Sequence, residues 1–218
     1  MMSLLKRTVL AVTVAVFTGL GATVAGIAQT APEPPRKPQN KPDQKNLLLK
    51  EVPDAAKDRK QLLKDLYTRL GQSEDGENSK MVATAIERLW LHSGSDTVDL
   101  LMKRVGDLMV KEEFDVALQI LDSVVEMAPD FPEGWNRRAA VYFQKKDYGK
   151  SLENLRYALA IDPSHYKAIQ GLGLLMQEMG EKEAALRAYR EALKVHPHMD
   201  DVRQSEKELA REVEGQGI

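Results

Sequence analysis

The 218-residue sequence contains no cysteine, and this absence removes several classes of site at once. The chain can form no disulfide, no cysteine-ligated zinc site and no thiolate nucleophile, and it offers no lipoprotein-type acylation site. A marked excess of charge is also missing, because 31 Lys and Arg face 33 Asp and Glu and leave a net charge of −2. Without a basic field we expect no nucleic-acid partner.

A catalytic set is missing as well. No serine stands in the strand–turn–helix context that a hydrolase nucleophile needs. The segment Gly171-Leu172-Gly173 has no strand before it, so it cannot be a phosphate-binding loop, and close packing of helices explains its glycines better. We therefore predict that the protein is not an enzyme and needs no cofactor. The composition, 43% hydrophobic and 29% charged, is that of an ordinary globular protein with one or two domains.

The first 28 residues differ in kind from the rest. Two basic residues near the start precede an uncharged run from Thr8 to Ala28 that is rich in Val, Ala, Gly and Thr. Gly26 and Ala28 supply small residues at the two positions that a signal peptidase reads. We predict a signal peptide over 1–28, a mature protein that is periplasmic or secreted, and no membrane contact after cleavage. The alternative is an uncleaved anchor, because a run of this length can span a bilayer.

Residues 29–53 are predicted to be a proline-rich linker. Prolines are interspersed there with Lys, Asn and Gln, at Pro32, Pro34, Pro35, Pro38 and Pro42. Such a composition forms neither a helix nor a core and suits an extended tether. The alternative is that Pro35-x-x-Pro38 is a ligand for a proline-binding domain.

Residues 98–199 carry the same pattern three times. Pro129, Pro163 and Pro197 stand 34 residues apart, each just after an apolar run. The blocks 98–131, 132–165 and 166–199 hold the same kinds of residue in the same columns, such as Leu101/Trp135/Ile169, Leu108/Tyr142/Met176 and Ala117/Ser151/Ala185. Each block has apolar spacing for two helices, separated by a polar turn and ended by the proline. A period of this size predicts a helical solenoid.

The second block resembles the tetratricopeptide (TPR) repeat, through Trp135-x-x-Arg138-Ala139-x-x-Tyr142 and, further on, Ala158 and Pro163. The resemblance implies an all-α fold, a right-handed α-solenoid of helical hairpins. Residues 200–218 are polar with a few spaced apolar positions, which predicts the capping helix and tail that a solenoid requires. The sequence departs from the family at Arg104 and Arg138, where a leucine is usual.

Residues 54–97 precede the repeats and contain two further helical patterns. The first runs from Asp54 to about Leu70 and is stopped by Gly71, and the second runs from about Asn78 to His92. Counting back one period places Tyr67-x-x-Leu70-Gly71 near the expected start of a repeat. We predict a divergent helical hairpin, a degenerate repeat stacked on the solenoid.

TPR proteins generally hold a peptide or a partner helix on the concave surface formed by their first helices, and the resemblance implies the same here. By position, the groove is predicted to contain Met102, Lys103, Met109, Asn136, Arg137, Phe143, Lys167, Gln170, Leu174 and Gln177. Arg137 and Lys103 share a column and are placed to meet a carboxylate. Gly171 stands where chaperone-tail-binding TPR domains have arginine, so that specialised role is not implied. The predicted function is a non-catalytic scaffold or adaptor in the bacterial periplasm with a protein or peptide partner.

Two alternatives remain open. The first is a metal-handling or enzymatic envelope protein that uses His196, His198 and Asp200, since imidazole and carboxylate groups suit zinc or nickel. The turn at Pro197 separates the two rings, so we predict no metal site. The second alternative is self-association through an exposed end of the solenoid.

Overall fold

A computed structural model describes residues 56–215, which belong to the second of two units of the chain, Lys41–Ile218. The predicted signal peptide and linker lie outside the described residues. Within the described range the elements are α-helices: α2 (Ala56–Gly71), α3 (Gly76–Trp90), α4 (Asp96–Val110), α5 (Phe114–Met127), α6 (Pro132–Gln144), α7 (Tyr148–Ile161), α8 (Tyr166–Glu178), α9 (Lys182–Val195) and α10 (Asp200–Val213). A search of these helices finds none with the length and apolarity needed to span a bilayer.

The helix ends follow from local sequence. The second helices α5, α7 and α9 each stop two residues before the proline of their block, since proline disfavours helical backbone in the residue before it. At the other ends, side chains accept the first free backbone N–H groups. Asp75 caps α3 through Asn78 N (2.6 Å), Asp147 caps α7 through Lys150 N (3.2 Å), and His165 Nδ1 caps α8 through Ala168 N (3.2 Å).

The turn between the two helices has the same geometry in each repeat. A backbone N–H after the turn donates at 2.9 Å to a carbonyl of the first helix, in the pairs Glu113–Leu108, Asp147–Tyr142 and Glu181–Met176. The residue before each donor has a positive φ, namely Glu112, Lys146 and Gly180. This is the helix C-terminal motif that favours glycine, and only the third repeat provides one.

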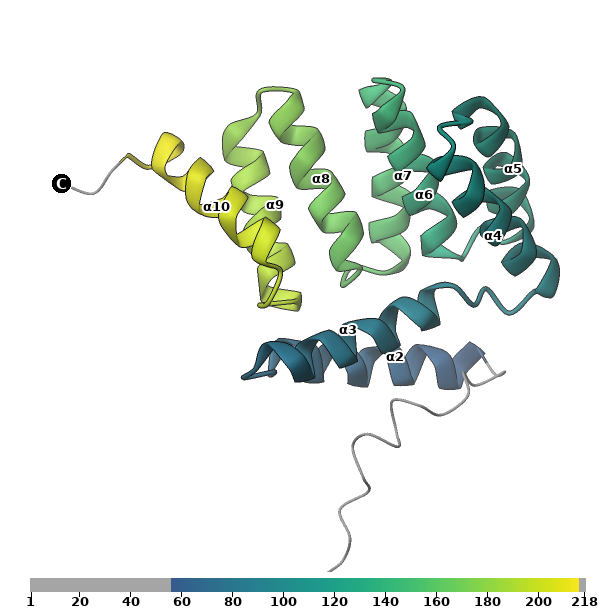
Figure 1. Cartoon of the computed structure of the whole chain (residues 1–218), viewed down its shortest axis with the longest axis horizontal. Helices are drawn as coiled ribbons and strands as arrows, with labels where there is room; N and C mark the ends of the chain where they lie inside the picture. The colour runs from purple at the N-terminus through teal and green to yellow at the C-terminus, as the bar shows by residue number, and fades with distance from the viewer. Residues whose placement is uncertain (1–55, 216–218) are drawn as a thin grey trace, which may run out of the picture. The chain divides into compact units, whose positions relative to one another are not determined.

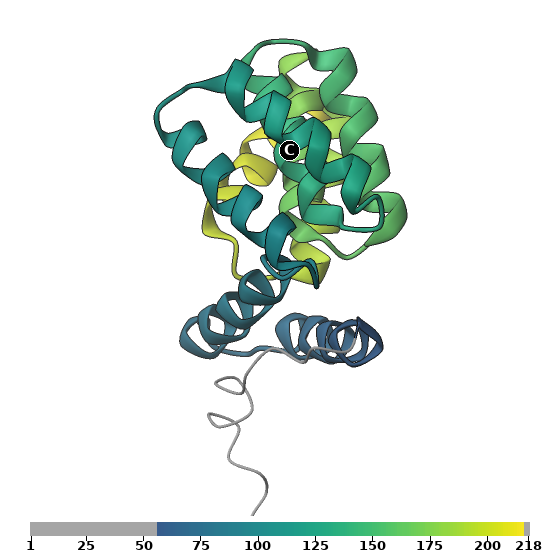
Figure 2. The same ribbon diagram turned by 90° about the vertical axis from the view of Figure 1, so that its right-hand side faces the viewer.

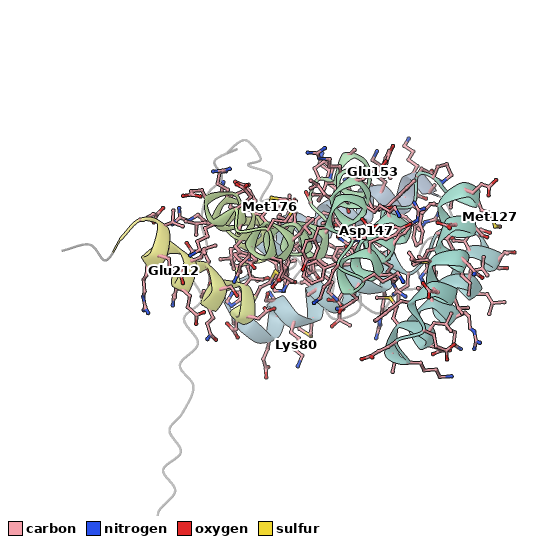
Figure 3. The ribbon with its side chains drawn as sticks, turned by 90° about the horizontal axis from the view of Figure 1, so that it is seen from above. Lys80, Met127, Asp147, Glu153, Met176 and Glu212 are labelled. Atoms are coloured by element: carbon pink, nitrogen blue, oxygen red, sulfur yellow. The ribbon has the colours of Figure 1, made fainter. Side chains whose placement is uncertain are left out.

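Each first helix packs against its own second helix, and α6, α8 and α10 also pack against the second helix before them, so α4 to α10 lie side by side in chain order (Figure 1). The column Ala117, Ser151 and Ala185 is buried where the two helices of a hairpin approach. Ser151 fits there because its hydroxyl donates to Ala139 O at 2.9 Å. Seen from above, Met127 of α5 and Glu212 of α10 lie at opposite ends of this row (Figure 3). The predicted all-α solenoid of hairpins is confirmed.

The α2–α3 hairpin packs against the third repeat and α10 and not against the first repeat, which follows it in the chain. Its buried residues, including Leu66, Leu70 and Ile86, share one core with Tyr189 of the third repeat and Leu209 of α10. The first repeat has a separate core. In Figures 1 and 2 the hairpin lies below the row of repeats, at the ends of their helices. The place of the hairpin on the solenoid follows from the apolar faces of α2 and α3, which meet the inter-repeat turns, and a count of periods does not reveal this.

Candidate interaction site

The predicted groove residues come from α4, α6 and α8, the first helices of the three repeats. Of the ten, several present side chains at the surface: Lys103 and Gln177 are exposed, Leu174 is 43% exposed, and Met109 and Phe143 are half-buried. Phe143 packs against the Tyr148 ring, with centroids 5.7 Å apart. Gln170 is bound to Asp201 of α10 (2.7 Å), and Gln177 accepts the Tyr189 hydroxyl (2.8 Å). These side chains can contact a ligand directly.

Met102 is not a surface residue. It is 1% exposed and lies in the core of the first repeat with Val98 and Val105. The same column holds Asn136 and Gln170 in the next repeats, where the side chains are polar and half-buried. A flexible apolar methionine instead turns inward and fills the core. Met102 therefore does not line the groove, contrary to the prediction.

Arg137 and Asn136 are already engaged by a carboxylate of their own helix. Glu133 Oε1 accepts from Arg137 Nε at 2.8 Å, and Glu133 Oε2 accepts from Asn136 Nδ2 at 2.8 Å. Arg137 Nη1 also donates to Met102 O at 3.0 Å and so joins α6 to α4. The predicted basic cluster therefore offers less positive charge to a partner carboxylate, because Arg137 already neutralises Glu133. Lys103 remains exposed on α4.

Glu133 is buried beside His165, which is fully buried. Because His165 Nδ1 accepts the Ala168 N–H, the proton of a neutral ring is on Nε2, which lies 3.3 Å from Glu133 Oε2. The alignment is too poor for a good hydrogen bond, so the contact is mainly electrostatic. Burial alone would raise the pKa of Glu133, but His165 and Arg137 outweigh it and hold the pKa at about 2. Glu133 is therefore a buried carboxylate that stays charged.

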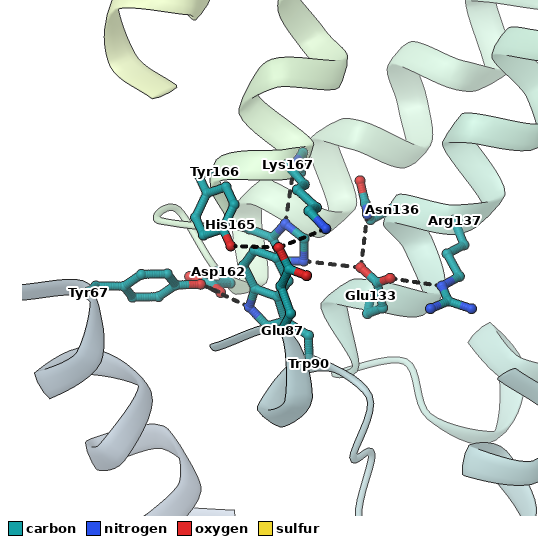
Figure 4. A network of polar contacts seen from close by, with 11 residues as sticks. Tyr67, Glu87, Trp90, Glu133, Asn136, Arg137, Asp162, His165, Tyr166 and Lys167 are labelled. Atoms are coloured by element: carbon teal, nitrogen blue, oxygen red, sulfur yellow. Dashed lines mark hydrogen bonds and ion pairs between the residues drawn. The ribbon is translucent and has the colours of Figure 1, made fainter. Parts of the chain in front are cut away.

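The α2–α3 hairpin joins this network through aromatic and acidic side chains (Figure 4). The Trp90 ring stacks on His165 with centroids 3.8 Å apart. Trp90 Nε1 donates to the Tyr67 hydroxyl at 3.0 Å, and that hydroxyl donates to Asp162 Oδ2 at 2.6 Å. Burial, with the Asp162 charge beside it, raises the pKa of Tyr67, so the phenol stays protonated. The hairpin is thus fixed to the turn between the second and third repeats.

Glu87 of α3 forms an ion pair with another predicted groove residue, Lys167. Its Oε1 lies 2.9 Å from Lys167 Nζ and accepts the Tyr166 hydroxyl at 3.1 Å (Figure 4). Burial, followed by the Glu87 charge, raises the pKa of Tyr166. Lys167 therefore binds the hairpin within the same chain, although its ammonium group is still partly in solvent.

Sequence reasoning missed the members of this network that come from outside the first-helix columns. Glu87, Asp162 and His165 carried no signal in the repeat pattern. Trp90 is buried, but nothing in the sequence indicated the ring that it meets. A Trp and a Tyr in the same divergent hairpin are the only cue, since buried aromatic N–H and O–H groups need polar partners.

The histidines proposed for a metal are used in the hairpin contact instead. His196 Nδ1 lies 3.5 Å from Ser79 Oγ, and its ring meets Tyr166 edge-on at 5.0 Å. His198 Nε2 lies 2.9 Å from Ser73 O. Burial lowers the pKa of His196, with His198 acting in the same direction. Among residues 56–215, no three His, Cys, Asp or Glu side chains are grouped so that they could hold a metal ion.

Comparison with known proteins agrees with this geometry. The family model for the tetratricopeptide repeat matches residues 132–165, the block with the fullest motif. A TPR repeat-containing protein of Rhizobium etli is 30% identical over 154 residues, which cover 71% of this chain and 75% of that protein. The chain belongs to the tetratricopeptide repeat family.

Solved TPR structures share its fold. The Sgt2 TPR domain from Aspergillus fumigatus aligns with a TM-score of 0.52 and 24% identity, over 55% of this chain and 81% of that domain. The first TPR of Spaghetti (RPAP3), solved with an HSP90 peptide bound, aligns with a TM-score of 0.52 and 18% identity, over 54% of this chain and 93% of that one. At these identities the likeness concerns the fold alone.

Proposed function

We propose that this TPR protein is a non-catalytic scaffold that binds an extended peptide or a helix of a partner protein across α4, α6 and α8. The observation that carries the proposal is that these first helices are neighbours, since α6 contacts α8 and Arg137 of α6 binds Met102 O of α4, with polar and apolar side chains still open to a ligand. Lys103 offers a cation to an acidic side chain, and Leu174, with Phe143 and Met109, offers apolar contact. The peptide bound to the RPAP3 domain supports this use of the fold.

A site-specific crosslinking experiment tests the groove. A photoreactive amino acid at Lys103 or Gln177 should trap the same partner in intact cells, whereas the same amino acid at Arg156, exposed on the second helix α7, should not. Leu174→Asp should abolish the crosslink from Gln177, because it places a charge among apolar contacts. Equal trapping from Arg156, or no effect of Leu174→Asp, would reject the groove as the binding site.

We further propose that the mature protein works in the bacterial periplasm. The support is the pattern of residues 1–28, basic then apolar then small, which is that of a cleaved signal peptide. A phosphatase reporter fused after residue 53 should be active only if the fusion is exported, and mass spectrometry of the mature chain should find Gln29 at its start. A chain that keeps residues 1–28 and stays with the membrane would support the anchor instead.

A further inference from the structure

The ion pair between Glu87 and Lys167 joins the α2–α3 hairpin to the predicted groove. It is partly exposed, with 42% of the Glu87 side chain and 46% of the Lys167 side chain open to solvent. The stacked rings that also hold the hairpin are buried, since Trp90 is 4% exposed and His165 is fully buried. In Figure 4, the Glu87 carboxylate lies between Tyr166 and Lys167, the first two residues of α8. A ligand in the groove can therefore reach this ion pair from solvent.

The column of Lys167 on the first helices is acidic at its other positions. The counterparts of Lys167 are Asp99 in the first repeat, Glu133 in the second and Asp201 in α10. Each of these carboxylates has a partner in the repeats or in the loop before them, in the pairs Asp99–Ser93, Glu133–Arg137 and Asp201–Gln170. Lys167 instead takes its counter-charge from the hairpin. A groove cation is thus neutralised by a carboxylate that the repeats do not provide.

Two donors converge on one oxygen atom of Glu87. Lys167 Nζ lies 2.9 Å from Glu87 Oε1, and the Tyr166 hydroxyl donates to the same oxygen at 3.1 Å. Tyr166 is 1% exposed, so leaving its hydroxyl without an acceptor is costly. A carboxylate oxygen satisfies the cation and the hydroxyl together, because it accepts several hydrogen bonds and carries the opposite charge. The group that replaces Glu87 at these two donors is therefore another carboxylate.

We propose that Glu87 is an internal competitor for the groove, and that it occupies the place that an acidic side chain of the bound partner takes. When the partner binds, its carboxylate accepts from Lys167 and Tyr166 in place of Glu87. The hairpin stays docked, because Leu70 and Trp90 remain buried in the core that it shares with the third repeat. The contact is therefore autoinhibitory and lowers the affinity of the groove. This role of Glu87 rests on the groove proposed above, and adds to it the charge of the partner and a regulatory use of the hairpin.

The exposed face of α8 indicates what else the partner carries. Leu174 is 43% exposed and follows Lys167 by two helical turns, so it lies about 10 Å further along the same face. Gln170, which stands between them, is bound to Asp201 of α10. The partner therefore presents an acidic side chain and an aliphatic side chain about 10 Å apart. A partner without the carboxylate would leave Glu87 in place and gain nothing from Lys167.

Crosslinking in intact cells tests this competition. The photoreactive amino acid is placed at Gln177 of the full chain, and the fraction of the chain that is trapped with its partner is measured at low expression. Glu87→Gln should raise this fraction by roughly two- to fivefold, the range that an exposed ion pair supplies. Lys167→Gln should lower it, and Glu87→Gln should give no gain in the Lys167→Gln chain. Glu77→Gln, which removes the same charge from an exposed position in the first turn of α3, should change nothing.

The possible outcomes separate the role of Glu87 from the groove itself. If Glu87→Gln leaves trapping unchanged or lowers it, while Leu174→Asp still abolishes it, the groove stands and Glu87 only fastens the hairpin. A gain that persists in the Lys167→Gln chain would show that the variant loosens the hairpin, and would overturn the competition. A trapped partner segment without Asp, Glu or a terminal carboxylate would also overturn it. Absence of specific trapping from the groove would reject the groove and, with it, this role of Glu87.

Discussion

Glu133 keeps its charge although only 8% of its surface is exposed. Moving a lone carboxylate from water into a protein interior costs several kcal/mol, so the group needs compensating partners. Arg137 and Asn136 of the same helix α6 supply them, together with His165, the residue that caps α8. The carboxylate therefore ties the second repeat to the third.

The stability that Glu133 contributes should depend on pH. Its pKa is about 2 in the folded protein and 4.5 in the unfolded chain, so its contribution is present above about pH 4.5 and is lost as the pH falls toward 2. Glu133→Gln should lower the free energy of unfolding at pH 7 by on the order of 3 kcal/mol, and this difference should shrink at pH 3. Urea unfolding at both pH values measures it. Glu153→Gln, an exposed carboxylate on α7, should show neither effect, and a pH-independent gap for Glu133 would contradict the assignment.

The Tyr67 hydroxyl joins the Trp90 indole of the hairpin to the Asp162 carboxylate of the turn between the second and third repeats. Tyr67→Phe should cost about 1–3 kcal/mol of unfolding free energy, because Trp90 Nε1 and Asp162 lose their partner. A double-mutant cycle with Asp162→Asn should give a coupling energy well above zero. Additive effects of the two changes would show that the hydrogen bond contributes nothing to docking.

At the scale of the helix, α8 and α9 approach each other closely at Gly173. A Cβ added at Gly173 would lie 2.5 Å from Tyr189 Cε1. The ring cannot move easily, because Tyr189 is 1% exposed and its hydroxyl donates to Gln177. The glycine is therefore required by packing, as the sequence indicated for this segment.

Two neighbouring glycines make a matched test of this requirement. Gly173→Ala should destabilise the protein by about 1–3 kcal/mol, since the two helices must separate. Gly171→Ala, in the same helix, meets only a Leu155 methyl at 3.4 Å and should be neutral or stabilising by up to about 1 kcal/mol. Thermal unfolding of both variants measures the contrast. Similar effects at the two positions would show that helix propensity, not contact with Tyr189, decides the outcome.

At the scale of the whole described region, stability is divided between separate cores. Leu70 of α2 shares a core with the third repeat and α10, while Val105 of α4 belongs to the core of the first repeat. In a solenoid each element is stabilised mainly by its neighbours. Because the α2–α3 hairpin packs on the third repeat, α2 and α3 are neighbours of α9 and α10, which are distant in the chain.

Leu70→Ala should therefore weaken helices far along the sequence. We expect a loss of about 2–5 kcal/mol, with faster hydrogen exchange in α9 and α10 as well as α3, and little change in α4 and α5. Val105→Ala should show the reverse distribution. Hydrogen exchange followed by mass spectrometry resolves these segments. Exchange that rises only in α2 and α3 would mean that the hairpin folds independently of the repeats.

Much of the fold could be predicted from the sequence, because a repeat depends on contacts between residues that are close in the chain. The columns of Ala117, Pro129 and Gly173 reflect helix packing and helix ends that recur every 34 residues. The candidate site was less predictable. The period placed Met102, Arg137 and Lys167 on the first helices, but a column does not say whether a side chain turns into the core or meets an internal carboxylate.

The sequence by itself determined the class of molecule: helical hairpins of one length, stacked in order and closed by a polar helix, since hydrophobic spacing and helix-ending residues act locally. Only the tertiary structure decided where the α2–α3 hairpin binds. Its position depends on Trp90 meeting His165 and Tyr67 meeting Asp162, pairs far apart in the chain that no periodicity relates. The same packing brought Glu87 onto Lys167, a groove residue by its column, because the hairpin lies against the third repeat.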